Sequence, residues 1–234
     1  MAQPMPPSYM AYDRTIVVFS PDGRLLQVEY AREMVKSGST SVGLRVADGI
    51  LLASVKTGVP LAVEDSYRKT YEIDHHMGVV SAGSLADARE LVELGRVRSQ
   101  IHRVTYGEPI SVATLTTYLC DRKHMVTQYA GVRPYGVGLL IGGVDNGDAR
   151  LFETEPSGTM IEWKAQAIGR GADKTKKVLE KDYKDGLDKE KGLKLILRAL
   201  KAGEKETGPE HVEVMYVTAT GTTRVSREEI RRSF

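Results

Sequence analysis

The stretch YDRTIVVFSPDGRLLQVEYAREMVKSGST, residues 12–40, decides how the rest of the sequence is interpreted. Its middle, residues 20–23, predicts a sharp turn, because Pro21 fixes φ at the second position and a glycine closes the turn. Apolar residues at three-to-four-residue spacing then predict a helix over residues 24–36 with one apolar stripe. Gly38 is expected to end that helix. The stretch therefore predicts an ordered extension that precedes a globular domain.

Composition limits the classes of protein that this sequence can encode. The 234 residues are 41% hydrophobic and 27% charged with a formal net charge of +2, which suits a soluble globular protein and does not favour a nucleic-acid partner. No apolar run is long enough to span a bilayer, and the single cysteine, Cys120, excludes an internal disulfide framework. We therefore expect a cytoplasmic protein with no membrane partner, no nucleic-acid partner and no cofactor.

Periodicity predicts the elements that follow Gly38. The expected strands cover residues 41–46, 50–55, 69–73, 77–82, 137–144, 150–153, 159–165, 212–218 and 223–225. Two long helices are expected to begin at Ser84 and near Ser111, and two more to cover residues 172–184 and 189–202. A last, short helix is expected to be capped by Ser226. Strands segregated from helices in two blocks predict an α+β fold, a four-layer α-β-β-α sandwich of two antiparallel sheets with helices outside.

The first long helix after the strands has two further predicted features. Ser84 is expected to cap it, with Asp87 as the capping-box partner three residues on. Its buried face is expected to include five residues, with Ile101 extending the pattern: Leu85, Ala88, Leu91, Val92 and Gly95.

Five segments carry a resemblance to a known family. They are YDR at 12–14, SPDGRLLQVEYA at 20–31, KSGST at 36–40, AGSLADAR at 82–89 and TQYAGVRPYGVGLLIGG at 127–143. In order and spacing they resemble the α subunits of the 20S proteasome, most closely the archaeal type, and the resemblance extends from about residue 10 to the end of the chain. It implies the sandwich fold of the N-terminal-nucleophile hydrolases, which agrees with the predicted layers. The implied parts are a flexible tail at 1–11, a gate motif, turn and helix at 12–38, and a single sandwich domain at 39–234.

This family contains catalytic β subunits as well as non-catalytic α subunits. A β subunit removes a propeptide to expose an N-terminal threonine, whose α-amino group is the base, while a lysine lowers the threonine's pKa and an acidic residue pairs with that lysine. Residues 39–43, STSVG, resemble that start, and Lys69 falls where the β lysine falls. However, Ser39 replaces the threonine, Val55 occupies the position of the acidic partner, and the preceding residues carry the α-type turn and helix. We therefore expect no catalytic residue; the alternative is an active threonine or serine peptidase processed near Ser39.

The resemblance also implies an assembly for the protein. Seven copies would form an α ring, and two such rings would cap two rings of β subunits. The helix at residues 24–36 would fill the cleft where a β subunit holds its substrate. Unfolded protein substrates would pass through the ring, and an AAA+ ATPase would dock on it through a C-terminal hydrophobic-Tyr-any tail.

A gate is implied for the residues at the axis of such a ring. The resemblance places five residues in the cluster that holds the gate open: Tyr12, Asp13, Arg14, Pro21 and Tyr30. The tail before them would obstruct the pore when this cluster is not formed. The simpler alternative is an ordinary frayed terminus, and the match of YDR favours the gate.

A pocket for the activator tail is implied between neighbouring subunits. In it, the ammonium group of Lys69 would pair with the C-terminal carboxylate of the tail. Gly83 and Ser84 would line the same pocket, with Leu25 and Glu29 near its rim. From the sequence without the family, a solvated lysine at a strand edge is a plausible interpretation of Lys69, and the motif decides against it.

A narrow annulus just inside the ring is implied for the loop Tyr129-Ala130-Gly131-Val132. Small residues there would surround the axis, so that unfolded chains alone pass. The alternative is a simple turn between a helix and a strand.

Other candidate sites are weaker. The histidines show no zinc-ligand spacing, and His75-His76 is expected to be a surface pair on an exposed turn. Cys120 is expected to be packed within a helix. Residues 169–174, GRGADK, lack the Gly-Lys-Ser/Thr ending of a phosphate loop and are expected to start a helix. Trp163 is expected to be a packing residue of the core or of a contact between subunits.

Overall fold

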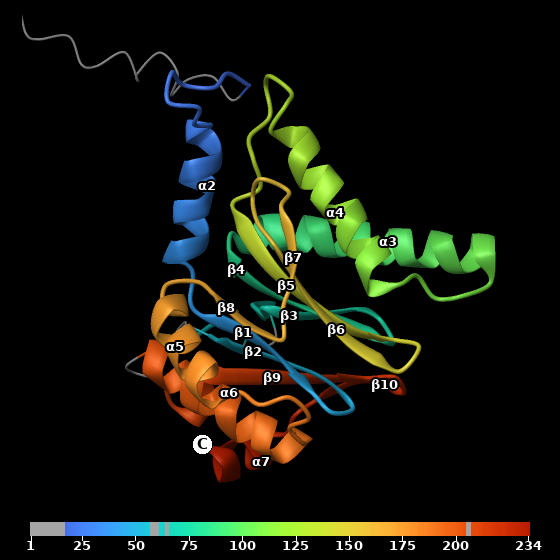
Figure 1. Cartoon of the computed structure of the whole chain (residues 1–234), viewed down its shortest axis with the longest axis vertical. Coiled ribbons are helices and arrows are strands. Elements are labelled where there is room, and N and C mark those ends of the chain that lie inside the picture. The colour runs from blue at the N-terminus through green and yellow to red at the C-terminus, as the bar shows by residue number, and fades with distance from the viewer. Residues whose placement is uncertain (1–16, 57–60, 64–65, 205–206) are drawn as a thin grey trace, which may run out of the picture.

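The computed structural model describes residues 17–56, 61–63, 66–204 and 207–234. Within these residues, two five-stranded antiparallel sheets lie face to face and helices cover their outer surfaces (Figure 1). The predicted four-layer α-β-β-α sandwich is therefore confirmed. Within the same residues, no helix has the length and apolar character that a membrane crossing requires.

The first sheet, here called the β1 sheet, has the strand order β10-β9-β2-β1-β8. Its strands are β1 (Ser41–Val46), β2 (Gly49–Val55), β8 (Ala165–Ile168), β9 (Val212–Thr218) and β10 (Gly221–Arg224). The second sheet, the β5 sheet, has the order β3-β4-β5-β6-β7. Its strands are β3 (Thr70–Asp74), β4 (Met77–Gly83), β5 (Val137–Asp145), β6 (Asp148–Thr154) and β7 (Met160–Glu162).

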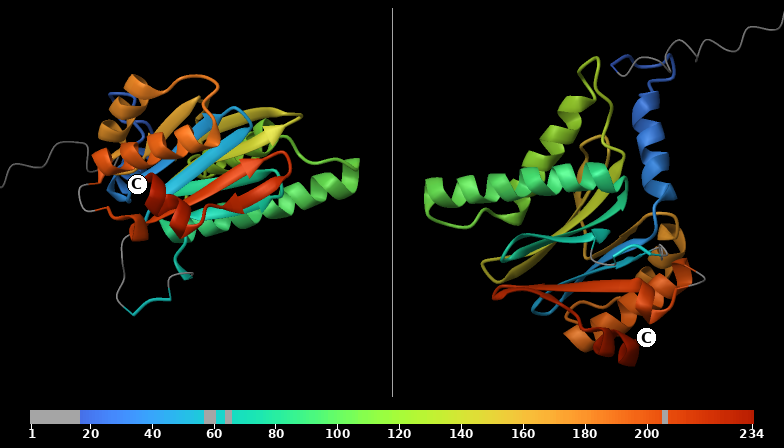
Figure 2. Two further views of the ribbon diagram at one scale, coloured as in Figure 1. Left: turned by 90° about the horizontal axis from the view of Figure 1, so that it is seen from below. Right: turned by 180° about the vertical axis from the view of Figure 1, so that it is seen from behind.

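Each sheet carries its own helices. Helices α3 (Leu85–Tyr106) and α4 (Val112–Val126) cover the β5 sheet, and α5 (Ala172–Asp182) and α6 (Lys189–Gly203) cover the β1 sheet (Figures 1 and 2). A short 3-10 helix, η2 (Pro209–His211), precedes β9, and α7 (Arg227–Ser233) ends the chain beside α6. These bounds lie close to the predicted ones because apolar periodicity reports the buried face of each element.

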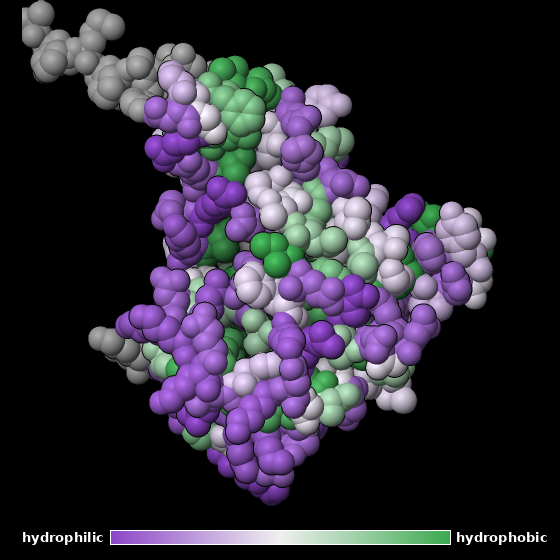
Figure 3. Space-filling view, viewed as in Figure 1, coloured by the Kyte–Doolittle hydropathy of each residue, from purple (hydrophilic) through white to green (hydrophobic). Residues whose placement is uncertain are grey.

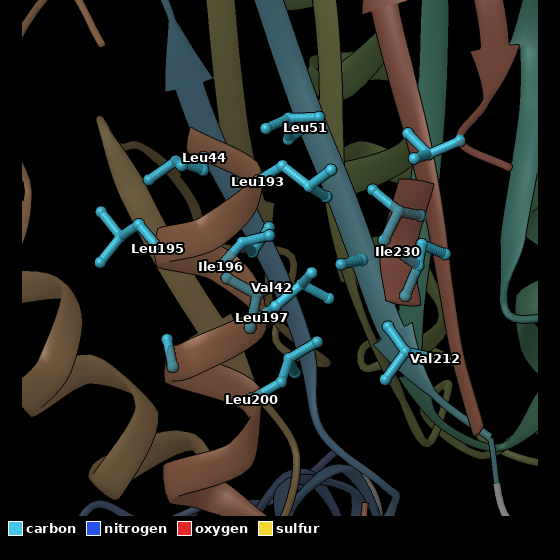
Figure 4. Packing of buried hydrophobic residues seen from close by; sticks show 14 of the residues in the cluster. Val42, Leu44, Leu51, Leu193, Leu195, Ile196, Leu197, Leu200, Val212 and Ile230 are labelled. Carbon is cyan, nitrogen blue, oxygen red and sulfur yellow. The ribbon is translucent and has the colours of Figure 1, made fainter. Parts of the chain in front are cut away.

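Three apolar clusters hold these layers together. One fills the space between the sheets and includes Ile50, Leu52, Val80, Leu140 and Met215. A second lies under α3 and α4. The third joins α6 to the β1 sheet, where leucine and isoleucine side chains of the helix point at those of β1 and β2 (Figure 4).

Helix α2 (Leu26–Ser37) lies against the ends of β4 and β5. Leu26, Val28 and Ala31 form its buried stripe. The turn before it is closed by a hydrogen bond from Gly23 N to Ser20 O of 2.8 Å, and Gly23 has a φ of +75°. Apolar surface gathers at this end of the molecule (Figure 3), where Val17, Val18 and Phe19 are exposed.

Four sequence predictions about these elements were wrong in detail. The strand expected at 159–165 is two strands, β7 and β8, which belong to different sheets. Leu85 and Ile101 are exposed, although they continue the apolar spacing of α3. Ser84 accepts the capping hydrogen bond from Asp87 N at 3.3 Å, but its own backbone N–H donates to Gly136 O at 2.9 Å, so the reciprocal half of the capping box is absent.

Candidate functional site

The chain runs from α2 into β1 through a tightly packed junction, Gly38-Ser39-Thr40. An added Cβ on Gly38 would lie 2.4 Å from Gly83 N, so a side chain cannot fit there without a shift. Arg170 N donates a hydrogen bond of 2.8 Å to Gly38 O, which fixes the junction to the segment after β8. Gly38 itself has extended backbone angles, φ −67° and ψ 151°, which any residue can adopt. A glycine is therefore required here because Gly83 lies too close for a side chain, and not because of a positive φ.

Lys69 reaches this junction from the start of β3. Its ammonium nitrogen donates to Ser39 O at 2.6 Å, Ser39 Oγ at 2.9 Å and Ser41 Oγ at 3.1 Å. Burial lowers the pKa of Lys69 to about 7, although the charges of Glu213 and Glu204 act in the opposite direction. Lys69 is therefore an internal lysine held by serine oxygens and is not the solvated lysine that its sequence context allows.

A second network holds the other side of the junction. Glu204 Oε1 accepts hydrogen bonds from Thr40 N at 2.9 Å and Thr40 Oγ1 at 2.8 Å, and Arg170 Nε lies 2.9 Å from Glu204 Oε2. Burial alone would raise the pKa of Glu204, but these hydrogen bonds outweigh it and hold the pKa below its ordinary value. Sequence analysis missed Glu204, because nothing in the sequence relates a residue after α6 to Thr40.

The junction has a serine beside a lysine, but its hydrogen bonds direct the serine elsewhere. Ser39 Oγ donates to Val55 O at 2.7 Å, so its proton points away from Lys69. Val55 is apolar and buried at the place where the resemblance expects an acidic partner for the lysine. Ser39 is also preceded without interruption by Gly38 and α2, so its backbone nitrogen is an amide nitrogen and cannot act as a base.

The residues of the predicted gate are only partly described. Tyr12, Asp13 and Arg14 lie outside the described residues. Pro21 is exposed in the turn before α2. Tyr30 is half exposed and lines a cavity of about 350 Å³ between α2 and the base of the 129–136 loop.

The residues of the predicted activator pocket lie in two groups within one chain. Lys69 and Gly83 both contact the junction, Lys69 at Ser39 and Gly83 at Gly38, and Ser84 is the next residue in the chain after Gly83. Leu25 and Glu29 lie near the opposite end of α2, about 20 Å and about 14 Å along the helix axis from Gly38 by the rise of 1.5 Å per residue. Arg24 Nε donates to Glu29 Oε1 at 2.7 Å, which holds that carboxylate beside the turn.

The loop predicted to form the annulus lies at the same end of the molecule as the start of α2 (Figure 1). Tyr129, Ala130, Gly131 and Val132 are all exposed, and Gly131 has a φ of +89°. The base of the loop is fixed to α3, because Asp87 binds both the Arg133 guanidinium group and Gly136 N. Asp87 was predicted as a cap and not as this anchor.

Lys123 is a further buried lysine that sequence analysis missed. Its ammonium nitrogen donates to Val137 O at 2.9 Å and to Thr154 Oγ1 at 2.7 Å, so it joins α4 to the first residue of β5 and the last of β6. Burial lowers the pKa of Lys123 to about 7. The sequence contains a signal for it, because Lys123 lies four residues after Leu119 and three before Val126 on the buried stripe.

The other candidates of the sequence are now placed. His76 is buried, so the expectation of a surface pair was wrong for it, and its Nε2 lies 2.9 Å from Ile110 O. Asp74, His75 and His76 bring three ligand atoms within 4.8 Å of one another, but Arg103 Nη2 already binds Asp74 Oδ1 at 2.7 Å. Cys120 is buried in α4, which raises the pKa of its thiol to about 11.

Comparison with known proteins defines the class of this fold and junction. Residues 35–217 match the family model described as proteasome subunit. Residues 12–33 match the N-terminal signature of proteasome A subunits. The matched regions contain the whole sandwich up to β9, together with α2 and the turn before it.

Individual relatives place the chain within that family. It is 46% identical to the proteasome subunit alpha of Methanopyrus kandleri, over 97% of this chain and 94% of the relative. It is 45% identical to the proteasome subunit alpha of Methanocaldococcus jannaschii, over 98% of this chain and 88% of the relative, and 51% identical to the proteasome subunit alpha 2 of Haloarcula marismortui, over 81% and 78%. The chain therefore belongs to the proteasome subunit family, in its α branch.

Proposed function

We propose that this α-type subunit has no peptidase activity of its own and forms the gated entrance of a protease complex whose active sites lie in β subunits. One observation carries the proposal: residues before Ser39 form α2, which is packed on β4 and β5 and runs unbroken into β1. A propeptide that is removed would not be expected to contribute buried residues such as Leu26, Val28 and Ala31 to the fold.

The assembly that we propose is a ring of seven copies stacked on a ring of β subunits. A ring needs complementary patches on opposite sides of each protomer. The gate would be formed by Tyr12, Asp13, Arg14, Pro21 and Tyr30, and the annulus by the loop 129–132. Their support is that the turn, the start of α2 and the loop all lie at one end of the protomer (Figure 1). The single cysteine supports a cytoplasmic location, which is part of the same proposal.

Docking of an ATPase tail near Lys69 completes the proposal. A C-terminal carboxylate brought to this lysine would stabilise its charged form and raise its depressed pKa. The ammonium group would then exchange its bonds to Ser39 and Ser41 for the carboxylate. Gly83 and Ser84 would contribute backbone at the same place, while Leu25 and Glu29 would contribute from the other end of α2 of this or a neighbouring copy.

The test uses particles assembled from this chain and its β partner. Hydrolysis of fluorescently labelled casein is measured with and without a peptide that ends in hydrophobic-Tyr-any. We expect the peptide to accelerate hydrolysis by wild-type particles and to lose its effect on particles with Lys69→Ala, while Lys174→Ala, an exposed change on α5, leaves the effect intact. Full activation of the Lys69→Ala particles would contradict the role of Lys69.

The alternative function, an active serine or threonine peptidase processed near Ser39, has one observation in its favour. Lys69 Nζ lies 2.9 Å from Ser39 Oγ, and its pKa of about 7 gives a substantial neutral fraction near pH 7. The intact mass of the purified chain separates the two functions. A species that begins at Ser39 or Thr40, together with casein hydrolysis in the absence of β subunits, would overturn our proposal.

A further inference from the structure

A basic groove lies next to Lys69 on the outside of the protomer. It has a volume of about 630 Å³ and is bounded by the segment before β3, the first turns of α3 and the end of β10. In the right-hand view of Figure 2, α3 (green) lies beside the sheet that contains β3 and β4 (teal). The charged residues that line the groove are Arg68, Glu72, Arg89, Arg96 and Arg224.

The positive charge of this groove is only partly compensated. Its one carboxylate, Glu72, already accepts a hydrogen bond of 2.7 Å from Thr222 Oγ1. Arg96 donates to Glu72 O at 2.9 Å and to Glu93 Oε1 at 2.6 Å, so its guanidinium group is occupied. The guanidinium groups of Arg89 and Arg224 are exposed and make no hydrogen bond or ion pair with any residue that the structure describes. Two arginines are therefore placed to bind an anion from outside.

The groove adjoins the segment that carries Lys69, although the buried Lys69 side chain does not line it. Arg68 and Thr70, which flank Lys69 in the sequence, both line the groove. Leu85 and Ala86, which follow Ser84, form part of its apolar wall, and Leu85 is 40% exposed. A peptide whose last residue reaches Lys69 would thus leave the docking site over a surface that combines an apolar wall with arginines.

We propose that this groove binds the residues directly upstream of the C-terminal triad in the docking tail, and that Arg89 and Arg224 select acidic side chains there. The inference rests on the proposed function, because it assumes that a tail docks at Lys69. Arginine is suited to this role, since its planar guanidinium group presents paired N–H donors that match a carboxylate. A row of acidic residues in the tail would complement the groove, whereas basic residues would be repelled.

The size of the effect follows from exposure of the two arginines. Ion pairs at exposed positions contribute about 0.2–1 kcal/mol each. Two such pairs therefore correspond to at most about a thirtyfold gain in affinity, which decreases as salt screens the charges. Most of the affinity would still come from the triad.

The experiment compares two peptides on assembled α–β particles. Both end in the same Leu-Tyr-Ala triad, and their six upstream residues are rich either in glutamate or in glutamine. Fluorescence anisotropy measures the dissociation constants at low and at high salt. We expect the glutamate peptide to bind up to about thirtyfold more tightly at low salt, with the difference shrinking at high salt.

Variants test whether Arg89 and Arg224 cause the preference for the glutamate peptide. Particles with both Arg89→Gln and Arg224→Gln should bind the glutamine peptide as wild type does but lose the preference for glutamate. The matched control changes two arginines of α7, Arg231→Gln and Arg232→Gln, and should keep the preference. Native mass spectrometry checks that the rings assemble.

Each contrary result has a separate meaning. If wild-type particles bind both peptides equally, the inference is overturned while tail docking stands. If the Arg89/Arg224 variant keeps the preference for the glutamate peptide, acidic residues do not bind in this groove, and the inference is again wrong. Failure of that variant to form rings would assign these arginines to a contact between copies of the chain. If neither peptide binds wild-type particles, the docking function itself fails.

Discussion

The guanidinium group of Arg133 donates two parallel hydrogen bonds to the carboxylate of Asp87, from Nη1 to Oδ2 and from Nη2 to Oδ1, each 2.7 Å long. Asp87 Oδ2 also accepts from Gly136 N at 2.8 Å. Burial alone would raise the pKa of Asp87, but these partners hold it below its ordinary value. A buried carboxylate in the first turn of α3 thus anchors the base of the loop that we assign to the annulus.

Removing this anchor should destabilise the protein. Asp87→Ala leaves Gly136 N without its acceptor and removes two charge-assisted hydrogen bonds, and we expect a loss of about 2–3 kcal/mol in the free energy of unfolding. Urea denaturation monitored by circular dichroism measures it. Asp121→Ala, an exposed change on α4, is the control and should stay within about 0.5 kcal/mol of wild type. Equal stability of the two variants would show that the anchor contributes nothing.

Glu204 should make the fold sensitive to acid. Its pKa is lowered in the folded state, so the unfolded chain takes up the proton first as the pH falls below the ordinary carboxyl value of 4.5. The stability that Glu204 contributes is therefore present above that pH and is lost below it. Glu204→Gln should lower stability at pH 7 by about 1.5–3 kcal/mol.

The acid dependence distinguishes this role from simple packing. Because Gln does not titrate, the difference between wild type and Glu204→Gln should shrink between pH 5 and pH 3 in urea titrations. Glu190→Gln, an exposed change in α6, should shift neither the stability nor its pH dependence. A difference that stays constant over this pH range would contradict the assignment.

Lys123 should produce a dependence of the same sign, but at neutral to alkaline pH. Its pKa falls from an ordinary 10.5 to about 7 on folding, so between these values the unfolded chain binds one more proton than the folded chain. Stability therefore rises with pH over this window, by at most about 1.4 kcal/mol per pH unit for one proton. The gain is absent below about pH 7.

Lys123→Met removes this titration at nearly constant side-chain length. We expect the stability of the variant relative to wild type to fall as the pH rises from 7 to 10, which chemical denaturation at a series of pH values measures. Lys174→Met, on the exposed side of α5, should show no such trend. Parallel pH profiles for wild type and Lys123→Met would exclude a neutral buried lysine.

We predict that position 38 requires a glycine because no side chain fits beside Gly83, and not because of its backbone angles. Gly38→Ala places Cβ 2.4 Å from Gly83 N, and the resulting displacement of the junction should cost about 1–3 kcal/mol. Ser37→Ala, one residue earlier and exposed, should cost less than about 0.5 kcal/mol. Thermal unfolding of both variants tests the difference, and a neutral Gly38→Ala would show that α2 can shift away from β4 without loss.

The order of layers was predictable from the sequence because it depends on local periodicity. The strand at 41–46 was predicted with its observed ends, Ser84 and Ser226 cap their helices as expected, and the second long helix begins next to Ser111 as expected. Such features are set by residues within a few positions of one another. The strand at 159–165 failed for the same reason: alternation marks an extended segment but does not tell which sheet it joins.

The candidate sites were predictable only where a motif is contiguous. The STSVG segment led to Ser39 and Lys69, although not to the bonds between them. Glu204 and Arg133 were missed as partners of Thr40 and Asp87, because each pair is far apart in the sequence and carries no mark of its contact. The gate residues 12–14 remain a prediction, since they lie outside the described residues.

The two residues between β7 and β8, Trp163 and Lys164, restrict movement of one sheet relative to the other. Trp163 N donates to Leu151 O in the β5 sheet at 2.8 Å, and Lys164 O, on the next residue, accepts from Arg45 N in the β1 sheet at 2.9 Å. Adjacent residues thus tie the two sheets together, so neither sheet can slide or rotate on the other without breaking these bonds. Widening of a ring built from such protomers would have to come from tilting whole copies or from rearranging residues ahead of α2.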